Sequence, residues 1–412
     1  MSSPTTAQKP QTPPETDRDA TRERSLARDL MSSSGMLVFL SIVLSLLFAA
    51  ILAASFNPAV RESASYFFAR PSDFLGSFGN AMRDFFTSLF RGAIFDYEGK
   101  TFVRMIRPLT DSLTNAVPLI FAGLAVAVAF RAGLFNIGAQ GQLIIGALVG
   151  GYVGIAWDLP PVIHLLVAVL GAMIGGAAWG AIPGLLKAKS GANEVIVTIM
   201  LNSVAGYLLS YALKTTTYIG TGHNGKSQYV RANAQLPDLL GSHFRLHLGF
   251  ILALLAAAFV WWLLERSTLG FEIRAAGANP HAARTAGISV NRTIMVTMAI
   301  AGGLAGLAAI GPALGTEKFL SGSIAATYGF DAITVALLGR SRPGGVVLAG
   351  ILFGALNSGA SLMQGAADIP VDIVQVSQAV IVLLIAAPPL VRWLLRLPEP
   401  TARLPRRRKE VA

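Results

Sequence analysis

The chain has no cysteine and few charged residues. The absence of cysteine among its 412 residues excludes disulfides, thiolate catalysis and iron–sulfur clusters. Asp, Glu, Lys and Arg make up only 13% of the sequence, whereas soluble domains carry about 25%. The five histidines are scattered, and no metal-binding spacing of the H-E-x-x-H kind occurs. These absences weigh against a soluble globular protein and against a metalloenzyme.

Long apolar runs take the place of the missing charge. Hydrophobic residues account for 53% of the chain and the mean hydropathy is +0.58, which predicts an integral membrane protein. A helix needs about 20 apolar residues to cross a bilayer. Ten apolar runs lie near residues 36–54, 109–130, 142–157, 160–186, 194–213, 247–264, 293–315, 330–339, 346–366 and 372–392. The run at 330–339 is too short to cross alone. The predicted fold is therefore an all-α integral membrane protein with about ten transmembrane helices, including broken or half-length ones.

Positive charge follows the expected membrane topology. The formal net charge is +11, but the basic residues form no continuous face that would suit nucleic acid. If the N-terminus is cytoplasmic, the inner segments hold 21 Lys and Arg and the outer segments hold 12. Cytoplasmic loops of membrane proteins carry an excess of these residues. We therefore predict that both termini are cytoplasmic and that nucleic acid is not a partner.

The two ends of the chain differ from its apolar centre. Residues 1–35 are rich in Pro, Thr, Ser and charge and lack apolar periodicity, which predicts a disordered cytoplasmic tail. Residues 36–396 form the predicted transmembrane domain, and 397–412 form a basic cytoplasmic C-terminal tail. Within the domain, 55–107 mixes aromatic clusters with charge. There we expect an amphipathic segment on the membrane face, with a short extra span as the alternative.

A glycine-rich stretch with interleaved amides separates two of the apolar runs. It reads RAGLFNIGAQGQLIIG at 131–146 and contains Gly133, Gly138 and Gly141 together with Asn136, Gln140 and Gln142. Glycine weakens a helix by about 1 kcal/mol relative to alanine, so three within nine residues favour unwinding. Unwound backbone at membrane depth requires protein or a water-filled cavity around it, and the amides could then line a path for a polar, uncharged solute. Alternatively, the glycines allow helices to pack closely.

Further polar side chains lie inside or at the ends of the apolar runs. They are Asn193, Asn202, Asn357, Ser358, Gln364, Gln375 and Gln378. A polar, uncharged solute presents hydrogen-bond donors and acceptors and no net charge, so amides suit it better than carboxylates. Each of these residues could equally hydrogen-bond a neighbouring helix. Charge inside the runs is sparse, with Asp331, Arg340 and Arg342 around the short run at 330–339, which argues against a proton relay.

One motif matches a nucleotide-binding loop in its letters only. Residues 220–227, GTGHNGKS, fit the phosphate-binding pattern G-x-x-x-x-G-K-[ST]. That loop binds phosphate between a buried strand and a helix. Here the sequence QYVRANAQLPDLL follows, which shows no clear apolar helix period, and the predicted topology places the loop outside, away from cytoplasmic ATP. We predict a glycine-rich outer loop without nucleotide binding.

The longest predicted cytoplasmic loop, residues 265–292, is rich in alanine, which favours helix. Pro280 suits the first turn of a short helix, Asn279 is a good N-cap before it, and Gly287 would end it. Arg284 would lie on this helix. A short helix held off the inner face suits docking into the groove of a partner protein. The alternative is a surface helix that lies on the bilayer.

Four motifs together resemble those of the permease subunits of bacterial ABC importers. In chain order they are LFNIGAQGQ at 134–142, GANEVIVTIMLN at 191–202, GFEIRAAGANPHAARTAGI at 270–288 and LLGRSRPGG at 337–345. The resemblance is to the simple-sugar and branched-chain amino-acid permease family, nucleoside-type branch, and covers about residues 105–395. It implies a ten-helix core, a second permease subunit that is related or identical, cytoplasmic ABC ATPase subunits and an extracytoplasmic substrate-binding protein. It also implies an ATPase-coupling helix formed by Gly277, Asn279, Pro280, Ala283, Arg284 and Gly287.

The predicted function is that of the transmembrane permease subunit of an ATP-driven ABC importer in the bacterial inner membrane. The cargo is a polar neutral solute, by resemblance a nucleoside. The chain is predicted not to be an enzyme and to bind no cofactor, because ATP and Mg²⁺ belong to the partner ATPase. Membrane lipid surrounds its helices. A permease for simple sugars such as ribose is the alternative. The docking loop and the missing ion-coupling charges disfavour an independent secondary transporter, and the absence of a metal spacing disfavours a membrane-embedded enzyme.

Overall fold

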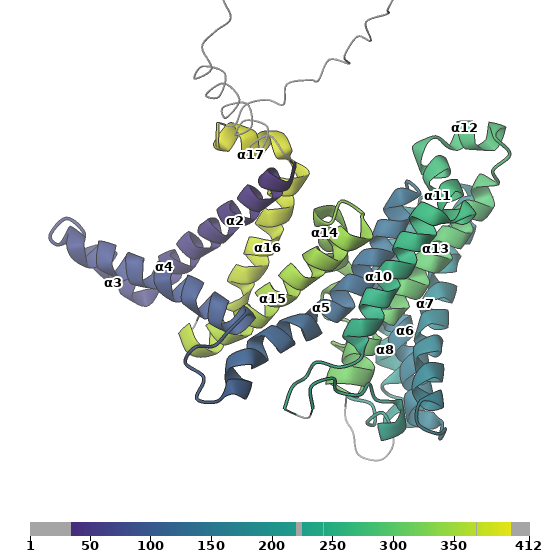
Figure 1. Cartoon of the computed structure of the whole chain (residues 1–412), viewed down its shortest axis with the longest axis horizontal. Helices are drawn as coiled ribbons and strands as arrows, with labels where there is room; N and C mark the ends of the chain where they lie inside the picture. The colour runs from purple at the N-terminus through teal and green to yellow at the C-terminus, as the bar shows by residue number, and fades with distance from the viewer. Residues whose placement is uncertain (1–33, 220–224, 242, 368, 397–412) are drawn as a thin grey trace, which may run out of the picture. The chain divides into compact units, whose positions relative to one another are not determined.

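The computed structural model describes residues 34–219, 225–241, 243–367 and 369–396, and within these ranges every regular element is a helix (Figure 1). The predicted tails at 1–35 and 397–412 lie outside this description except for Ser34 and Gly35. The helices are α2 (Ser34–Phe56), α3 (Pro58–Ser65), α4 (Pro71–Ala93), α5 (Phe102–Arg131), α6 (Ala139–Ala156), α7 (Ile163–Ser190), α8 (Glu194–Ala212), α9 (Thr216–Ile219), the 3₁₀-helix η1 (Ala232–Ala234), α10 (Gly249–Arg266), α11 (Thr268–Ala278), α12 (Pro280–Thr285), α13 (Val290–Leu307), the π-helix η2 (Gly311–Thr316), α14 (Tyr328–Leu338), α15 (Pro343–Ala367), α16 (Val371–Ala386) and α17 (Pro388–Leu394).

The described chain divides into two compact units. The smaller unit comprises residues 34–48 and 379–396, in which Leu37, Leu384 and Val391 pack together. The larger unit comprises residues 49–378 and contains all of the polar groups considered below. Helices α2 and α16 contribute to both units.

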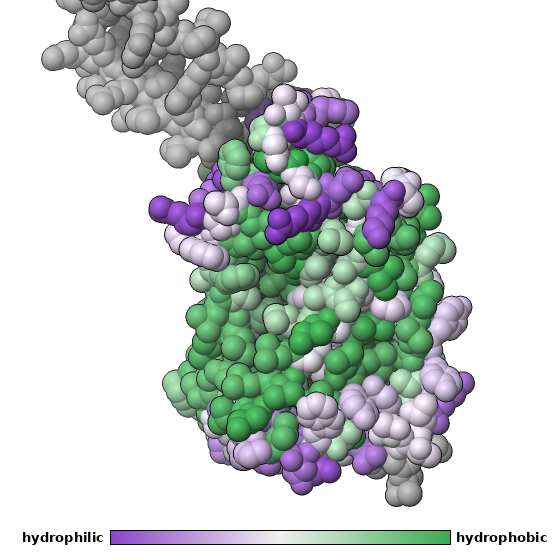
Figure 2. Space-filling view, turned by 90° about the vertical axis from the view of Figure 1, so that its right-hand side faces the viewer, coloured by the Kyte–Doolittle hydropathy of each residue, from purple (hydrophilic) through white to green (hydrophobic). Residues whose placement is uncertain are grey.

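Ten apolar helical segments match the ten predicted runs. Eight are long and apolar enough to cross a membrane, namely those at 35–56, 102–131, 139–156, 163–190, 194–212, 249–266, 290–316 and 343–365. The two shorter ones are α14 and the 372–385 part of α16. The eleven residues of α14 rise about 16 Å, roughly half the thickness of the apolar core, so the predicted half-helix is confirmed. On the face seen in Figure 2, a broad band of hydrophobic side chains lies between hydrophilic residues above and below it.

Helix α5 begins seven residues earlier than the predicted start at 109. Its N-cap is Thr101, whose Oγ1 accepts a hydrogen bond from the backbone N–H of Arg104 at 3.4 Å. The first two turns carry charge, which is why the apolar pattern alone placed the start too late. These charged residues share one side of α5 and line a polar cavity, so helix and charge are compatible there.

The last predicted run, 372–392, is not one helix. Helix α16 ends at Ala386 and α17 begins at Pro388. Proline has no backbone N–H and disfavours helical dihedrals in the residue before it. Ala387 accordingly has φ −118° and ψ 69°, outside the helical region, and separates the two helices.

The segment at 55–107 contains an amphipathic helix, as predicted. Helix α4 buries Ala81, Phe85 and Leu89 on one side, while Phe86 and Phe90 remain exposed. It is not among the described helices that are long and apolar enough to cross a membrane, which favours the amphipathic segment over an extra span. Instead its C-terminal end packs against α15, where a Cβ on Gly92 would lie 2.9 Å from the Cα of Gly359.

Helices α5, α6 and α13 form the buried centre of the larger unit. Within their most apolar windows 83%, 72% and 67% of the residues are buried, compared with 28% for α7 and 22% for α8. Glycine allows α7 to approach α13, because a Cβ at Gly176 would lie only 2.3 Å from the carbonyl oxygen of Gly302. Without a hydrophobic driving force between helices in lipid, such close backbone contact is how transmembrane helices gain packing energy.

Candidate functional site

The helical path of the chain is broken between α5 and α6. Residues 132–138 are not helical, and Gly133 has φ +69°, a left-handed conformation that side-chain-bearing residues avoid. The end of the break lies well along an apolar helix, because Ile137 contacts Asn202, the ninth residue of α8. At 1.5 Å per residue Asn202 is about 12 Å from the start of its helix. The predicted unwinding is therefore confirmed.

Amide side chains satisfy the polar backbone of this break. Asn202 Nδ2 donates to the carbonyl oxygen of Ile137 at 2.9 Å, and its Oδ1 accepts from the N–H of Gly141 at 2.8 Å. Asn136 and Gln142 are buried and exchange two hydrogen bonds, of 2.9 and 3.1 Å. Unpaired backbone groups in the apolar core cost several kcal/mol each, so these amides make the irregular segment tolerable there.

The glycines at the break also permit close packing, as the second interpretation held. A Cβ on Gly138 would lie 2.9 Å from the Cβ of Thr198, and one on Gly141 would lie 2.9 Å from Asn202 Oδ1. Both contacts are with α8. The two interpretations thus apply to different positions, since Gly133 supplies the backbone conformation whereas Gly138 and Gly141 supply the space.

Gln140 connects the break to the half-helix α14. Its Nε2 donates to the carbonyl oxygen of Ala326 at 2.8 Å, and its Oε1 accepts from the N–H of Gly329 at 2.8 Å. The start of α14 therefore meets the start of α6. Gln140 and Asn202 are partly exposed, unlike Asn136 and Gln142, so they are the amides of this group that a solute could approach.

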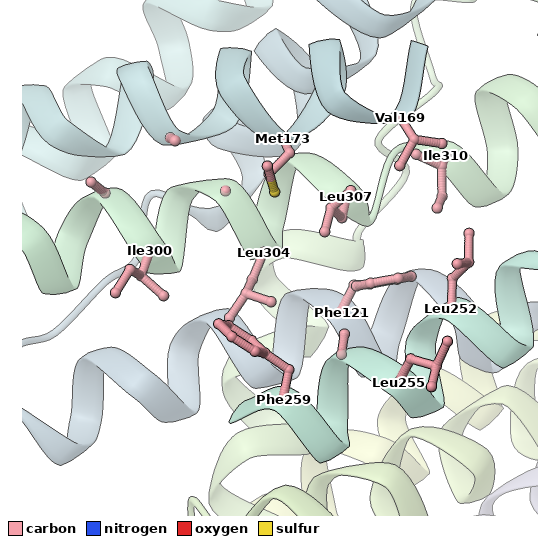
Figure 3. Close-up of a pocket in the computed structure, with 14 residues that line it drawn as sticks. Phe121, Val169, Met173, Leu252, Leu255, Phe259, Ile300, Leu304, Leu307 and Ile310 are labelled. Carbon is pink, nitrogen blue, oxygen red and sulfur yellow. The ribbon is translucent and has the colours of Figure 1, made fainter. Parts of the chain in front are cut away.

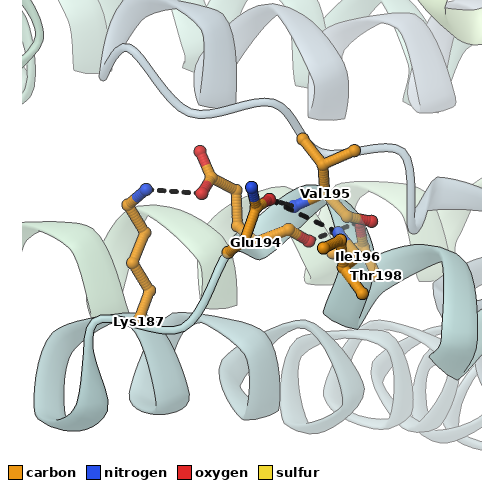
Figure 4. A network of polar contacts seen from close by, with 6 residues as sticks. Lys187, Glu194, Val195, Ile196 and Thr198 are labelled. Atoms are coloured by element: carbon orange, nitrogen blue, oxygen red, sulfur yellow. Dashed lines mark hydrogen bonds and ion pairs between the residues drawn. The ribbon is translucent and has the colours of Figure 1, made fainter.

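The start of α8 is held by an ion pair and a cap. Asn193 Oδ1 accepts hydrogen bonds from the N–H groups of Val195 and Ile196, and Lys187 Nζ forms an ion pair with the carboxylate of Glu194 (Figure 4). The Glu194 side chain is only 10% exposed. A carboxylate in the first turn also interacts favourably with the helix dipole, so Asn193 and Glu194 both serve the helix end here.

The remaining predicted residues lie along α15 and α16. Gln378 Nε2 donates to Asn357 Oδ1 at 2.9 Å, and Ser358 Oγ donates to the carbonyl oxygen of Gly92 at 2.8 Å. Gln378 and Ser358 are buried, whereas Gln364 and Gln375 are exposed. Gln375 and Gln378, three residues apart, therefore have different surroundings in the described chain.

A cavity of about 570 Å³ between α5, α7, α10 and α13 is lined almost entirely by carbon (Figure 3). Phe121, Met173, Phe259 and Leu304 are among the side chains that point into it. A polar solute there would lose its hydrogen bonds to water without replacement, at a cost of several kcal/mol. This cavity is therefore not suited to a polar cargo.

A polar cavity, which the sequence analysis missed, lies beside the N-terminal half of α5. Its volume is about 530 Å³, and its lining includes Asp111, Asn115 and Arg245. The signal was present in the spacing, because Arg104, Asp111 and Asn115 follow the helical period along α5. The late predicted start of this helix hid that pattern.

The short helix predicted in the loop at 265–292 is present as α12 and lies at an extremity of the larger unit in Figure 1. Asn279 Oδ1 accepts from the N–H groups of His281 and Ala282 at 3.0 and 3.1 Å, and Pro280 is in the first turn. Gly287 follows the helix with φ +84°. Ala283 is buried while Arg284 is exposed, so α12 is anchored by one side and presents the other.

The loop helices contact the break directly. Gly277 lies near the end of α11, where a Cβ would be 2.3 Å from the carbonyl oxygen of Arg131. Arg131 Nε in turn donates to the carbonyl oxygen of Ser341 at 3.0 Å, in a turn where Arg340 and Ser341 both have positive φ. Two of the four motifs, those at 270–288 and 337–345, therefore meet at Arg131, three residues before the first motif begins.

The segment that follows the phosphate-loop pattern is extended and packs on another loop. Residues 220–224 lie outside the described chain. Ser227 donates its N–H to the carbonyl oxygen of Leu320 at 2.8 Å, and Val230 pairs with Lys318 in the same way. The helix that a phosphate loop requires does not follow Ser227. Within the described ranges no three His, Asp or Glu side chains gather in a way that could hold a metal ion.

A histidine is buried beneath these two loops. His247 is fully buried, its Nδ1 accepts from the N–H of Gly249 at 3.1 Å, and its Nε2 has no partner among the described residues. Burial, together with the positive charges of Lys318 and Arg245, lowers the pKa of His247 to about 4. The imidazole is therefore neutral at physiological pH.

Comparison with known proteins agrees with the arrangement found here. A model of the family described as "Branched-chain amino acid transport system / permease component" matches residues 109–387. The guanosine ABC transporter permease protein NupP of Bacillus subtilis is 42% identical over 290 residues, which cover 69% of this chain and 82% of that protein. The glucose ABC transporter permease protein TsgB13 of Haloferax volcanii is 38% identical, covering 67% of this chain and 75% of that protein. The nucleoside ABC transporter permease protein NupB of Lactococcus lactis is 35% identical, covering 68% and 79%.

No solved structure matches this chain. The match to the family model covers more than half of the sequence, and the first relatives are aligned over most of their length. The protein therefore belongs to the branched-chain amino acid transport system permease family, as a membrane-spanning permease subunit of an ABC transporter whose ATPase is a separate protein.

Proposed function

We propose that this subunit carries nucleosides into the bacterial cytoplasm across the inner membrane. The names of two relatives, a guanosine permease and a nucleoside permease, support this cargo. The glucose permease of Haloferax volcanii supports a second candidate, a simple sugar. Both solutes are polar and uncharged, and the membrane-depth break is likewise lined by amides without a free charge.

The proposed solute path passes the break on the side of Gln140 and Asn202. These two amides are partly exposed, whereas Asn136 and Gln142 are buried and saturate each other. We assign the buried pair to maintaining the shape of the break. Asn193, Asn357, Ser358 and Gln378 hold helix ends and helix contacts beside the path, and the exposed Gln364 and Gln375 are available to a second permease subunit.

The observation that carries the proposal is the chain of contacts from α12 to the break. Helix α12 presents Arg284 outward, α11 precedes it, and Gly277 of α11 contacts Arg131 at the start of the break. A partner ATPase that moves α12 would therefore move backbone that borders the solute path. Coupling between sites of this kind is typically worth about 1–3 kcal/mol. The outer loops at 55–108 and 214–246 are the proposed docking surface for a substrate-binding protein.

The experiment is uptake of labelled guanosine and of labelled glucose into proteoliposomes that contain the complete transporter, with ATP inside. Arg284→Glu should abolish uptake, because the charge reversal lies on the exposed side of α12. Arg292→Glu is the matched control, since Arg292 is exposed on the neighbouring α13 and should leave uptake nearly unchanged. Guanosine uptake by this chain alone, driven by an ion gradient and indifferent to ATP, would contradict the proposal.

A further inference from the structure

The polar cavity beside α5 has no role in the path described above. It lies between α5, the end of α4, α15 and the loop before α10, and its volume of about 530 Å³ is within the range of small-molecule sites. We call it the Asp111 cavity and define it by its polar lining, Asp96, Arg104, Arg107, Asp111, Asn115, Arg245, Ser358 and Ser361.

Helix α5 presents a polar stripe to this cavity. Arg104, Pro108, Asp111 and Asn115 follow one another at intervals of four, three and four residues, which places them on one side of the helix. Asp111 is nine residues beyond Phe102, about 13 Å along the helix axis. A partly buried carboxylate near the end of an apolar span is costly, and such residues face cavities that serve function.

The carboxylate of Asp111 is only partly satisfied within the described residues, because Oδ2 forms an ion pair with Arg107 while Oδ1 has no hydrogen-bond partner. Its Oδ1 is buried without a hydrogen-bond partner, and its Oδ2 lies 3.7 Å from Arg107 Nε, beyond hydrogen-bonding distance. More than nine in ten buried polar groups have a partner, so an unused acceptor beside an open cavity calls for a donor from outside the described chain. Hydroxyl groups are such donors.

The neighbouring side chains complement a pair of hydroxyls. Asn115, one turn along α5, offers a donor and an acceptor in its amide. The Oγ of Ser358 already donates to the carbonyl of Gly92, and that of Ser361 donates to Asn357 at 3.2 Å, so both face a ligand as acceptors. The guanidinium groups of Arg104 and Arg245 supply donors. This set offers acceptors and donors around one carboxylate.

We propose that the Asp111 cavity binds the vicinal diol of a sugar ring, with Asp111 accepting from the two hydroxyls and Asn115 contacting the same pair. The inference rests on the proposed import of a solute that contains such a ring. Guanosine and glucose, the cargoes named for two relatives, share this feature although their other parts differ. The cavity therefore recognises the ring that both classes of cargo have in common, before the solute reaches the break.

Because the chain contains no cysteine, a single introduced thiol can be labelled without background from other thiols of this chain, which allows a direct test. Asn115→Cys introduces a single thiol into the cavity of the complete transporter, and its reaction with a membrane-impermeant methanethiosulfonate reagent is followed over time. Guanosine should slow the reaction at least about threefold, whereas 2′,3′-dideoxyguanosine should leave it unchanged. Adding the isosteric Asp111→Asn should abolish the protection. Pro161→Cys, exposed in the turn between α6 and α7 and outside both proposed docking loops, is the matched control and should react equally with and without solute.

The same labelling separates this inference from the proposed cargo. If glucose protects and guanosine does not, the diol site stands and the nucleoside cargo is wrong. If ATP-dependent guanosine uptake occurs but neither solute protects, the cargo stands and the diol site is wrong. The site is equally overturned if the thiol fails to react, if dideoxyguanosine protects as well as guanosine, or if the binding protein alone protects, since the cavity would then be a docking surface.

Discussion

Asn202 is predicted to hold the membrane-depth break in place. Its side chain is the partner of two backbone groups, the carbonyl of Ile137 and the N–H of Gly141. The substitution Asn202→Leu keeps the size and branching of the side chain and removes both hydrogen bonds. It therefore isolates the polar contribution from the packing of α8 against α6.

The expected cost follows from the two groups left unpaired. A buried group that loses its partner costs about 1–3 kcal/mol, whereas hydrogen bonds between membrane helices average about 0.6 kcal/mol. Asn202 is partly exposed, so for the two groups together we expect the free energy of unfolding to fall by roughly 2–3 kcal/mol, between the totals that these two values imply. With the scaling for domains of ordinary size, about 2–4 °C per kcal/mol, the midpoint of thermal unfolding should fall by roughly 4–12 °C.

The assay is thermal unfolding of the purified permease in detergent, followed by loss of the monodisperse fraction. Ser203→Leu makes a similar polar-to-apolar change at the neighbouring, exposed position of α8 and should shift the midpoint by less than about 1 °C. If Asn202→Leu unfolds within a degree of the unchanged protein, the break does not depend on Asn202. The assignment of this amide to the unwound backbone would then be wrong.

Two further predictions concern the inner and outer faces. Gly277→Ala places a Cβ 2.3 Å from the carbonyl oxygen of Arg131, so uptake should fall about tenfold while ATP hydrolysis by the complete transporter continues. Gly206→Ala, whose Cβ would have nothing within 4 Å, should change neither activity. Equal loss of both activities in Gly277→Ala would point to misfolding instead. The pKa of His247 is lowered from 6.5 to about 4 in the folded protein, so stability is fully present above pH 6.5 and should decline by roughly 3 kcal/mol as the pH falls to about 4. Comparison of unfolding midpoints between pH 7 and pH 4 tests this, and His247→Gln should reduce the dependence on pH; an unchanged dependence would assign the effect to other groups.

Features carried by local sequence were predicted well. The ten apolar segments follow from runs of residues that cannot be left in water, and the break after α5 follows from Gly133, whose conformation is available to glycine at little cost. The short helix α12 was likewise encoded locally, since Asn279, Pro280 and Gly287 fix its start and end within a few residues. In each case the physical cause lies within one or two helical turns of the residue concerned.

Some elements had boundaries that the apolar pattern placed wrongly. The charged first turns of α5 were excluded from the predicted helix because a hydropathy pattern counts charge as a loop signal. Only the surrounding α4 and α15 show that this charge lines a cavity. The same limitation hid Asp111, which in the sequence is a single acidic residue near the end of an apolar run.

Sequence by itself therefore determined the class of protein, the number and approximate positions of its apolar helical segments, the point at which one path unwinds, and the presence of a capped helix in the loop at 265–292. Tertiary structure alone decided which polar side chains are already paired. Asn136 pairs with Gln142, which is 6 positions away along the chain. Asn202 pairs with the backbone of the break, which is more than 60 positions away. Tertiary structure also decided that Gly277 contacts Arg131 and that Asp111 Oδ1 has no hydrogen-bond partner in the described part of the chain. The reason is physical: an amide's hydrogen bonds and a carboxylate's surroundings depend on which helices meet in space, and side-chain identity does not specify those meetings.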